Sequence, residues 1–258
     1  MCYDIKASLK AQLKRAQQDG DEQAIREITE KLVPQTDLPV HHASGFQHPR
    51  ILMYTGESKH MPVVATWGLV PAWVKDEAQK NQLWNNTLNA RGETIFEKPA
   101  FKDAAISKRC IVYLDGFYEH HHLNKKAYPF YVHAANGAPL AVAGLWSAWL
   151  PPGSSTPLIT FTLVTTAGNS LMAKIHNNTG EKGPRMPLLL SEEQEELWLA
   201  PIAKEHDRIE LERLISRSPE NTLIAHPVEA LRGKTYRGNV PSITEEAIYP
   251  ELAFFDFS

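Results

Sequence analysis

From residue 34 onward, the chain is divided into short runs of β-branched and aromatic residues that are separated by Gly, Pro and polar turns. Runs of this length and composition predict β-strands, and the turns between them favour antiparallel pairing or a barrel. The six strongest runs are ILMY at 51–54, MPVVATW at 61–67, RCIVYL at 109–114, YPFYVH at 128–133, LAVAGLW at 140–146 and LITFTLVTT at 158–166. We therefore predict a β core that is largely antiparallel and barrel-like.

Helices are predicted on both sides of this β-rich region. Residues 4–33 carry apolar residues at helical spacing before and after a polar breaker at 19–21, which predicts a helical pair. The sequence SEEQEELWLA predicts a later helix, with Ser191 as its N-cap and Gln194 completing a capping box. A second amphipathic helix is predicted around Ile209–Ile215.

No internal repeat, low-complexity tract or linker divides the sequence, so we predict a single α+β domain over residues 1–258. Within it we expect the helical pair at about 4–33, the β-rich core at about 34–190, and C-terminal helices with a tail at about 191–258. A chain of 258 residues that is 43% hydrophobic is large enough to bury a full core.

Composition and charge exclude several classes of protein. The sequence has no long apolar run and no charged-then-apolar leader, so we expect neither a membrane span nor a signal peptide. Two cysteines cannot form a disulfide framework, which favours a reducing, cytoplasmic compartment. A net charge of −3 gives no global attraction to nucleic acid, so DNA binding would need a local basic groove. We expect a monomer without a cofactor.

One of the two cysteines is the second residue, in the opening MCYD. If Met1 is removed, Cys2 carries an α-amine beside its thiol, and an amine with a pKa near ~8 is partly unprotonated at neutral pH. Aldehydes react with such a pair first as a Schiff base and then as a thiazolidine ring. The alternative is that Cys2 lies in a frayed terminus and has no chemical role.

Two further motifs contain residues suited to binding. WGLVPAW places Trp67 and Trp73 around a Gly and a Pro in a predicted loop. These rings are either a lid over the core or a platform on which a base or sugar stacks. NARGET sets Asn89, Arg91 and Glu93 in alternation, so a strand would point them to one side. The alternative is a solvated strand face with an internal ion pair.

Two more segments carry titratable groups. In DGFYEHHH, a strand would put His120 and His122 on one face and Glu119 on the other. The two histidines suit zinc, but no third ligand lies at a spacing typical of zinc sites. We therefore predict no metal site. An acid beside two aromatic rings suits a raised pKa and general acid catalysis. His176, which precedes a Gly-rich loop, is either a structural histidine or a catalyst.

Taken together, these segments resemble the SRAP (SOS response-associated peptidase) family. The resembling stretches occur in family order and reach to about residue 230: MC at the start, PVHHASGFQHPR, WGLVPAW, NARGET with FEKPAFK, RCIVYLDGFYE, and IH followed by RMP. The resemblance implies a DNA damage function, in which an N-terminal cysteine captures the ring-opened aldehyde of an abasic site in single-stranded DNA as a thiazolidine. It also implies minor lyase activity, and the family's older label implies a peptidase.

The resemblance also implies roles for the catalytic residues. Cys2 would be the nucleophile, and Asn89 would hold the Cys2 amine or the sugar. Glu119 would shuttle the proton that opens the deoxyribose and forms the imine. His176 would assist proton transfer and steady the sugar hydroxyl or the phosphate.

For DNA binding, the resemblance implies that Arg91 and Arg185 hold backbone phosphates. Trp67 and Trp73, with Pro71, would wedge against the bases that flank the lesion. A protein with these roles would be associated with the nucleoid when it acts.

Three departures from the family pattern bear on these expectations. The usual Gly-Arg after the cysteine is Tyr3-Asp4 here, which puts an acid where a basic residue would meet DNA. The usual IHxRMP becomes IHNNTGEKGPRMP, an insertion that would displace Arg185. Around DGFYE, the usual proline and tryptophan are replaced, and His120 stands in the place of the tryptophan, where it would stack more weakly.

Two other functions remain open on the sequence. In an N-terminal-nucleophile or cysteine hydrolase, Cys2 would attack an amide with its own amine or His176 as the base. In a noncovalent single-stranded DNA-binding module, the chemistry of Cys2 would have been lost.

Overall fold

The structure is a computed structural model that describes residues 2–18, 20–180, 183–216, 223–255 and 257. Met1 and residue 19 of the predicted breaker lie outside these ranges. The described strands are β1 Asp4–Ala7, β2 Val40–Ser44, β3 Arg50–Thr55, β4 Val63–Trp67, β5 Asn89–Arg91, β6 Arg109–Leu114, β7 Gly116–Leu123, β8 Lys126–Ala134, β9 Leu140–Trp149, β10 Leu158–Ala167, β11 Arg185–Pro187, β12 Leu189–Leu190 and β13 Leu223–Pro227. The α-helices are α1 Leu9–Gln12, α2 Lys14–Gln18, α3 Glu22–Glu27, α4 Glu77–Trp84, α5 Lys102–Ser107, α6 Ser170–Ile175, α7 Glu192–Leu199 and α8 Glu205–Ile215.

Five of the strands close into a barrel. β4 pairs with β3, β3 with β6, β6 with β9 and β9 with β10, all antiparallel, and a parallel pairing of β10 with β4 completes the ring. At its margins, β5 and β11 pair with β10, and β12 pairs with β9. All six strongest runs form strands, which confirms the predicted α+β fold with a largely antiparallel, barrel-like core.

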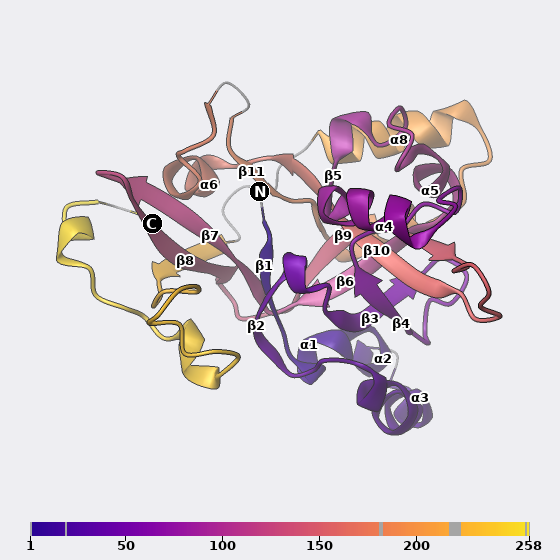
Figure 1. Ribbon diagram of the computed structural model, residues 1–258, viewed down its shortest axis with the longest axis horizontal. Helices are drawn as coiled ribbons and strands as arrows, with labels where there is room; N and C mark the ends of the chain where they lie inside the picture. Colours follow the sequence, from indigo (N-terminus) through magenta and orange to yellow (C-terminus); the bar gives the residue numbers. More distant parts are fainter. Residues whose placement is uncertain (1, 19, 181–182, 217–222, 256, 258) are drawn as a thin grey trace.

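The other strands form a second sheet in the order β13-β8-β7-β1-β2. β1 lies in its interior, antiparallel to both β2 and β7, and between the β7–β8 hairpin and the barrel (Figure 1). The predicted helical pair therefore begins too early. Ile5 and Ala7 are fully buried because they face the core from a strand, and helix α1 begins only after Ser8, whose side chain accepts the Ala11 N–H.

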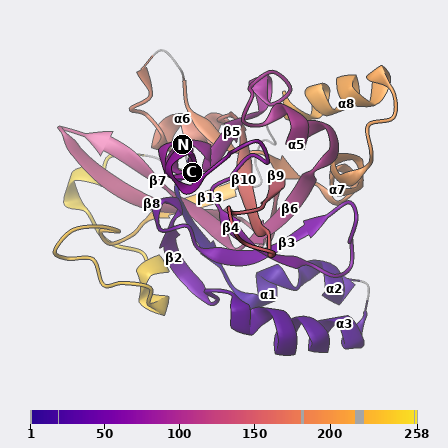
Figure 2. The same ribbon diagram turned by 45° about the vertical axis from the view of Figure 1, so that its right-hand side comes forward.

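Helices cover opposite sides of the barrel. α1, α2 and α3 lie together on one side and α8 on the other, while the C-terminal segment runs beside β7 and β8 (Figures 1 and 2). α7 begins with the capping box predicted at Ser191 and Gln194, and α8 contains the helix predicted at Ile209–Ile215. Among the described residues, no helix has the length and apolar character that crossing a bilayer requires.

The largest apolar core contains side chains of both sheets. It includes Ile5 and Phe117 of the second sheet, and Trp67 and Phe161 of the barrel. Cys2 belongs to the same core, because β1 carries the start of the chain inward. The second residue of the chain is therefore held in a fixed, buried position rather than in a frayed terminus.

Candidate active site at the start of the chain

Cys2 is 1% exposed and is held from two sides. The Asn89 side chain donates from Nδ2 to the Cys2 carbonyl oxygen over 2.7 Å, and the Cys2 Sγ lies 3.6 Å from the carbonyl oxygen of Asp4. Burial, and then the negative charge of Glu119, raise the pKa of the Cys2 thiol well above its usual range. The sulfur is therefore a neutral thiol at pH 7, not a thiolate.

Asn89 is the first residue of β5, where it pairs with Leu163 of β10. The residue before it is fixed by Trp67, whose Nε1 donates to the Leu88 carbonyl oxygen over 2.7 Å. Among the described residues, the buried Oδ1 of Asn89 accepts no hydrogen bond. A buried amide oxygen without a donor is costly, so this atom is suited to accept an N–H or O–H at the site.

Glu119 lies on β7, as predicted, and is 7% exposed. The strand alternation is also as predicted, since Glu119 is buried and His120 and His122 are only partly so. Asp4 pairs with Tyr118, and the same register continued by one residue puts Tyr3 opposite Glu119. The carboxylate accepts the His120 N–H at Oε1 over 3.1 Å. β1 and β7 together thus bring Glu119 to the start of the chain.

His176 directly follows α6 and reaches the same place. Its Nδ1 lies 3.6 Å from Oε2 of Glu119 and 3.2 Å from the backbone nitrogen of Arg185. Burial lowers the pKa of His176, although the charge of Glu119 opposes this. Nδ1 also lies 3.2 Å from the Arg185 carbonyl oxygen, so it accepts the Arg185 N–H in one tautomer and donates to that oxygen in the other. A neutral histidine therefore lies beside a buried carboxylate.

The insertion between His176 and Arg185 does not separate these two residues. β11 begins at Arg185 and pairs with the end of β10, which returns the chain to His176 after the loop. Arg185 therefore lies beside His176 despite the insertion. The extra residues form a loop, of which 177–180 and 183–184 are described.

Arg185 is 6% exposed and serves the site from within. Its guanidinium donates two hydrogen bonds to the Glu93 carboxylate, over 2.9 and 2.8 Å, and one to the Thr165 carbonyl oxygen over 2.7 Å. Glu93 lies in a 3₁₀ helix, Gly92–Thr94, instead of continuing the predicted strand alternation. The sequence predicted that Arg185 binds a phosphate. Its donors are instead engaged within the protein, where they hold the segment that follows Asn89 in place.

Arg91 is half-buried, and within the described part of the chain its guanidinium makes no hydrogen bond or ion pair. Burial and Glu119 raise the pKa of Tyr3, and the charge of Arg91 opposes this rise. Arg91 also lies on β5 two residues after Asn89, which contacts Cys2.

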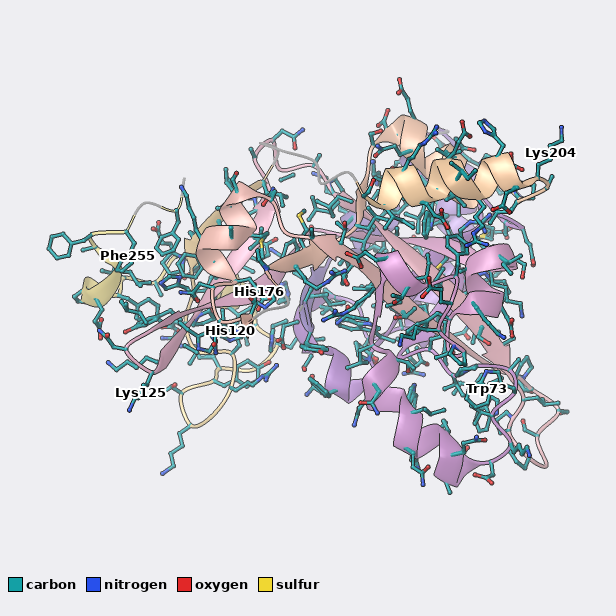
Figure 3. All side chains as sticks on the ribbon, turned by 90° about the horizontal axis from the view of Figure 1, so that it is seen from above. Trp73, His120, Lys125, His176, Lys204 and Phe255 are labelled. Carbon is teal, nitrogen blue, oxygen red and sulfur yellow. The ribbon has the colours of Figure 1, made fainter. Side chains whose placement is uncertain are left out.

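The WGLVPAW residues do not gather at Cys2. Trp67 is the last residue of β4 and has no exposed surface, and Pro71 is buried, so neither offers a face to a base. Trp73 is 43% exposed, but it lies far from His120 and His176 (Figure 3). The alternative reading of a lid over the core fits Trp67, and the predicted wedge does not.

An open hollow of about 910 Å³ adjoins the residues around Cys2. Tyr3, Glu119 and His176 form part of its wall, and the rest is contributed by His120, His122, Lys126, Ala127, Tyr128, Pro129, Asn178, Ala230, Leu231, Arg232, Tyr249 and Glu251. The residues after 225 were not predicted to belong to a site, because their contact with β1 and β7 is long-range and leaves no local pattern in the sequence.

Asp4 does not oppose DNA in the way its charge suggested. It is 3% exposed, and its carboxylate pairs with Arg232 over 2.8 Å and with His42 over 3.1 Å. Burial raises the pKa of Asp4, but the hydrogen bond from His42 and the charge of Arg232 outweigh it and lower the pKa. Asp4 is therefore internal and paired, and its charge is not directed into the hollow. No group of three or more potential metal ligands occurs among the described residues.

The same arrangement of motifs is found in known proteins. The model of one protein family, SOS response associated peptidase (SRAP), matches residues 1–234. The chain belongs to the SRAP family. Its relatives include the abasic site processing protein YoqW of Bacillus subtilis (strain 168), 36% identical over 180 residues, which are 69% of this chain and 74% of YoqW. The abasic site processing protein HMCES of Gallus gallus is 30% identical over 205 residues, 71% of this chain and 56% of HMCES, so the SRAP chain spans about half of that relative.

Solved structures share the fold. A crystal structure of a protein from Bacteroides thetaiotaomicron superimposes with a TM-score of 0.80 at 30% identity, covering 96% of this chain and all (100%) of that one. A protein from Bordetella bronchiseptica gives a TM-score of 0.67 at 22% identity, covering 89% of this chain and 100% of the other, and shows the fold alone.

Proposed function

We propose that this protein captures abasic sites in single-stranded DNA covalently, with Cys2 as the N-terminal residue after removal of Met1. The observation that carries the proposal is the convergence of Cys2, Asn89, Glu119 and His176 beside one open hollow. The relatives that are named abasic site processing proteins support the choice of substrate.

The chemistry follows from the two nucleophiles of an N-terminal cysteine. The amine adds to the aldehyde carbon of the ring-opened deoxyribose, and the resulting carbinolamine loses water to give an imine. The thiol then adds to the imine carbon and its proton passes to the nitrogen, which closes the thiazolidine. The overall reaction joins protein and DNA with the loss of one water, and it needs no oxidant, metal or cofactor.

Each neighbouring residue has a role in this sequence. Glu119 transfers the protons that open the sugar and expel water from the carbinolamine. His176, neutral beside Glu119, assists proton transfer and contacts the sugar hydroxyl or phosphate. The Oδ1 of Asn89 accepts a hydrogen bond from the Cys2 amine, while its Nδ2 keeps the Cys2 carbonyl in place.

The raised pKa of the thiol suits this order of events. A thiol that is neutral while the amine reacts does not compete for the aldehyde, and it adds once the imine is formed nearby. Arg91 supplies positive charge on the side of Cys2, and the hollow accepts the strand. Trp67, Pro71 and Arg185 are not part of the interface we propose, because all three are buried.

The arrangement supports the two other functions less well. A cysteine hydrolase needs a thiolate, which a neighbouring histidine or positive charge favours by lowering the pKa. Here burial and Glu119 raise it, and the His176 ring is directed to Glu119 and Arg185. A purely noncovalent module does not require Cys2 to be buried and held by Asn89. Nor does it require the Oδ1 of Asn89 to lie without a hydrogen-bond donor among the described residues. Minor strand cleavage through the Schiff base and peptidase activity remain side reactions to assay.

Intact-mass analysis after mixing with an abasic single strand tests the proposal. Protein that begins at Cys2 is expected to gain the mass of the oligonucleotide less one water and to keep it on denaturation. An undamaged strand is the control and is expected to give no adduct. Cys2→Ala retains the amine, so it is expected to form only a transient Schiff base. A stable adduct on protein that retains Met1 would show that another nucleophile acts.

A further inference from the structure

Arg232 is anchored to the inside of the protein and directed outward. Its Nη2 donates to Oδ2 of Asp4 over 2.8 Å, and Asp4 is held from behind by His42. The Asp4 side chain is 4% exposed, whereas that of Arg232 is 58% exposed. The carboxylate thus lies in the protein interior, while the guanidinium keeps most of its surface and most of its five donors at the solvent boundary.

The second cation of the hollow is arranged differently. Among the described residues that line it, Arg232 is the only arginine and Lys126 the only lysine. Lys126 pairs over 2.9 Å with Glu251, a surface carboxylate of the same hollow. An ion pair with both members in solvent presents little net charge to a ligand, and it is easily screened. Asp4, the partner of Arg232, is buried and does not line the hollow.

Arg232 also lies close to the reacting groups. It lines the same hollow as Glu119 and His176, and its charge acts on His120. The pKa of His120 is lowered, mainly by burial; Glu119 and Asp4 oppose this, and Arg232 contributes to it. A second hollow of about 310 Å³ includes Arg232 as well, so the guanidinium marks the boundary between the two.

The groups behind Arg232 serve to hold it. Asp4, His42 and Tyr236 form a chain of hydrogen bonds, with the His42 Nδ1 2.7 Å from the Tyr236 hydroxyl. Such a chain resembles those that activate a nucleophile, but burial and Asp4 raise the pKa of Tyr236. A hydroxyl that is harder to ionise is a poor nucleophile. The chain therefore fixes the Asp4 carboxylate, and through it the position of Arg232.

We propose that Arg232 is a phosphate-binding residue that holds the DNA backbone at the hollow beside Cys2, with Asp4 as its internal anchor. The identity of the ligand as a single strand rests on the function proposed above. A guanidinium fixed on one edge loses little conformational freedom when its other donors bind two phosphate oxygens. The acid at position 4 thereby helps to place a cation in the DNA path.

Binding of an undamaged single-stranded oligonucleotide, measured by fluorescence anisotropy over a range of salt concentrations, tests this role. Arg232→Gln is expected to weaken binding about tenfold at low salt. It is also expected to reduce the slope of log K against log salt by about 0.7, the value for one phosphate contact on a single strand. Arg232→Lys keeps the charge, so it is expected to retain the slope while losing part of the affinity.

Arg237 provides a matched control. It pairs over 2.7 Å with Glu229, its side chain is 59% exposed, and it does not line either hollow. Arg237→Gln is expected to leave both affinity and slope unchanged. Equal losses of affinity in Arg232→Gln and Arg237→Gln would show an effect of general surface charge and would overturn the assignment. Unchanged binding by Arg232→Gln would overturn it as well.

Two further measurements separate a phosphate contact from an indirect effect. The variant Asp4→Asn/Arg232→Gln leaves no unpaired buried charge, and it is expected to bind as weakly as Arg232→Gln. Recovery of affinity would show that the loss came from the stranded Asp4 carboxylate. Arg232→Gln is expected to need more abasic strand than the parent to reach half of its maximal rate of adduct formation, whereas Arg237→Gln is not. If the parent itself forms no adduct, the covalent function fails, while the comparison of Arg232 with Arg237 still decides whether this residue binds a strand.

Discussion

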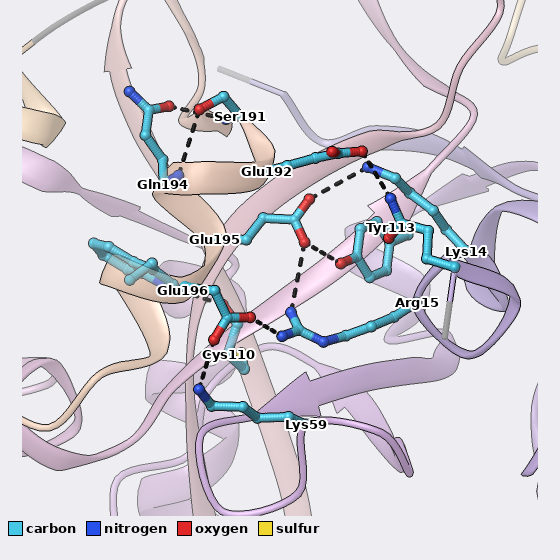
Figure 4. Close-up of polar contacts among 12 residues, drawn as sticks. Lys14, Arg15, Lys59, Cys110, Tyr113, Ser191, Glu192, Gln194, Glu195 and Glu196 are labelled. Atoms are coloured by element: carbon cyan, nitrogen blue, oxygen red, sulfur yellow. Dashed lines mark hydrogen bonds and ion pairs between the residues drawn. The ribbon is translucent and has the colours of Figure 1, made fainter. Parts of the chain in front are cut away.

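Two buried carboxylates, Glu195 and Glu119, have similar exposure and very different surroundings. Glu195, on α7, is 4% exposed and accepts hydrogen bonds from Lys14 over 3.3 Å and from Arg15 over 3.5 Å, and another from the Tyr113 hydroxyl (Figure 4). Glu119 is 7% exposed, has a backbone N–H and a neutral histidine as neighbours, and lines an open hollow.

The difference shows how the setting of a buried acid separates structure from chemistry. Glu195 joins the N-terminal helix α2, the barrel strand β6 and helix α7, and its hydrogen bonds to Lys14, Arg15 and Tyr113 hold it in one arrangement. Glu119 accepts a backbone N–H and lies 3.6 Å from His176, a partner that can exchange a proton. Cationic partners suit an acid that must stay charged, whereas a neutral histidine suits one that must gain and lose a proton.

The largest effect is expected from breaking the Glu195 cluster. Glu195→Gln removes the carboxylate paired with Lys14 and leaves Arg15 with Glu196 alone, so it is expected to lower the free energy of unfolding by about 3 kcal/mol. Chemical denaturation measures this change. Glu192→Gln, on the exposed face of the same helix, is the control and is expected to stay within about 0.5 kcal/mol of the parent. A Glu195→Gln protein as stable as the control would remove the structural role assigned to this cluster.

The next effect concerns the chemistry of Glu119. Glu119→Gln keeps the shape of the side chain but cannot exchange the proton, so capture of an abasic strand is expected to slow by about 100-fold or more. That factor corresponds to about 2.7 kcal/mol in the activation barrier. Crosslinking time courses on gels measure the rate, and undamaged-strand binding should barely change. Glu195→Gln, assayed below its melting temperature, should react at the parent rate. Equal rates for Glu119→Gln and parent would exclude Glu119 from the mechanism.

A smaller effect is expected on acidification. The pKa of His176 is lowered in the folded protein, mainly by burial, whereas in the unfolded chain it is near ~6.5. The stabilisation from the neutral ring is complete above the unfolded pKa and is lost as the pH falls through the folded pKa. His176→Gln removes this contribution, so its stability should fall less than that of the parent between about pH 7 and pH 5. An identical pH dependence in the two proteins would contradict the lowered pKa.

The smallest effect is expected at Trp73. It lies away from the hollow, and its Nε1 donates to the Pro99 carbonyl oxygen over 3.2 Å. Trp73→Ala is therefore expected to change the affinity for a short abasic oligonucleotide by less than about 0.5 kcal/mol. A loss of about 1–3 kcal/mol, the usual value of a stacked base, would extend the interface across the molecule. Repeating the titration with longer strands shows whether Trp73 is reached only by their ends.

Local patterns in the sequence predicted most of the fold. Runs such as RCIVYL and LITFTLVTT form strands, and Ser191 caps its helix as expected, because strand alternation and capping are decided by neighbouring residues. The first strand was missed because Ile5 and Leu9 also fit a helical spacing. What makes Asp4–Ala7 a strand is pairing with β2 and β7, one of which lies more than a hundred residues away.

The site was predictable to a similar degree, for similar reasons. The motifs identified Cys2, Asn89, Glu119 and His176, and the structure brings these residues together. The burial of Trp67 could not be predicted, since tryptophan packs in cores and at interfaces alike. An arginine is buried only where the fold supplies partners, and the pairing of Arg185 with Glu93 and Thr165 is visible only in the tertiary structure. The pairing of Asp4 with Arg232 joins residues 228 positions apart, and only the tertiary structure shows it.

The loop between His176 and Arg185 has a consequence for how such a protein can change. Both of its ends are fixed, one by α6 and the other by the pairing of β11 with β10, and the Arg185 backbone nitrogen lies 3.2 Å from the His176 side-chain Nδ1. Chain length at this point is therefore uncoupled from the geometry of the catalytic groups. We expect insertions of further residues there to leave the proposed capture reaction intact, so a fluorophore or an affinity handle can be attached at this loop.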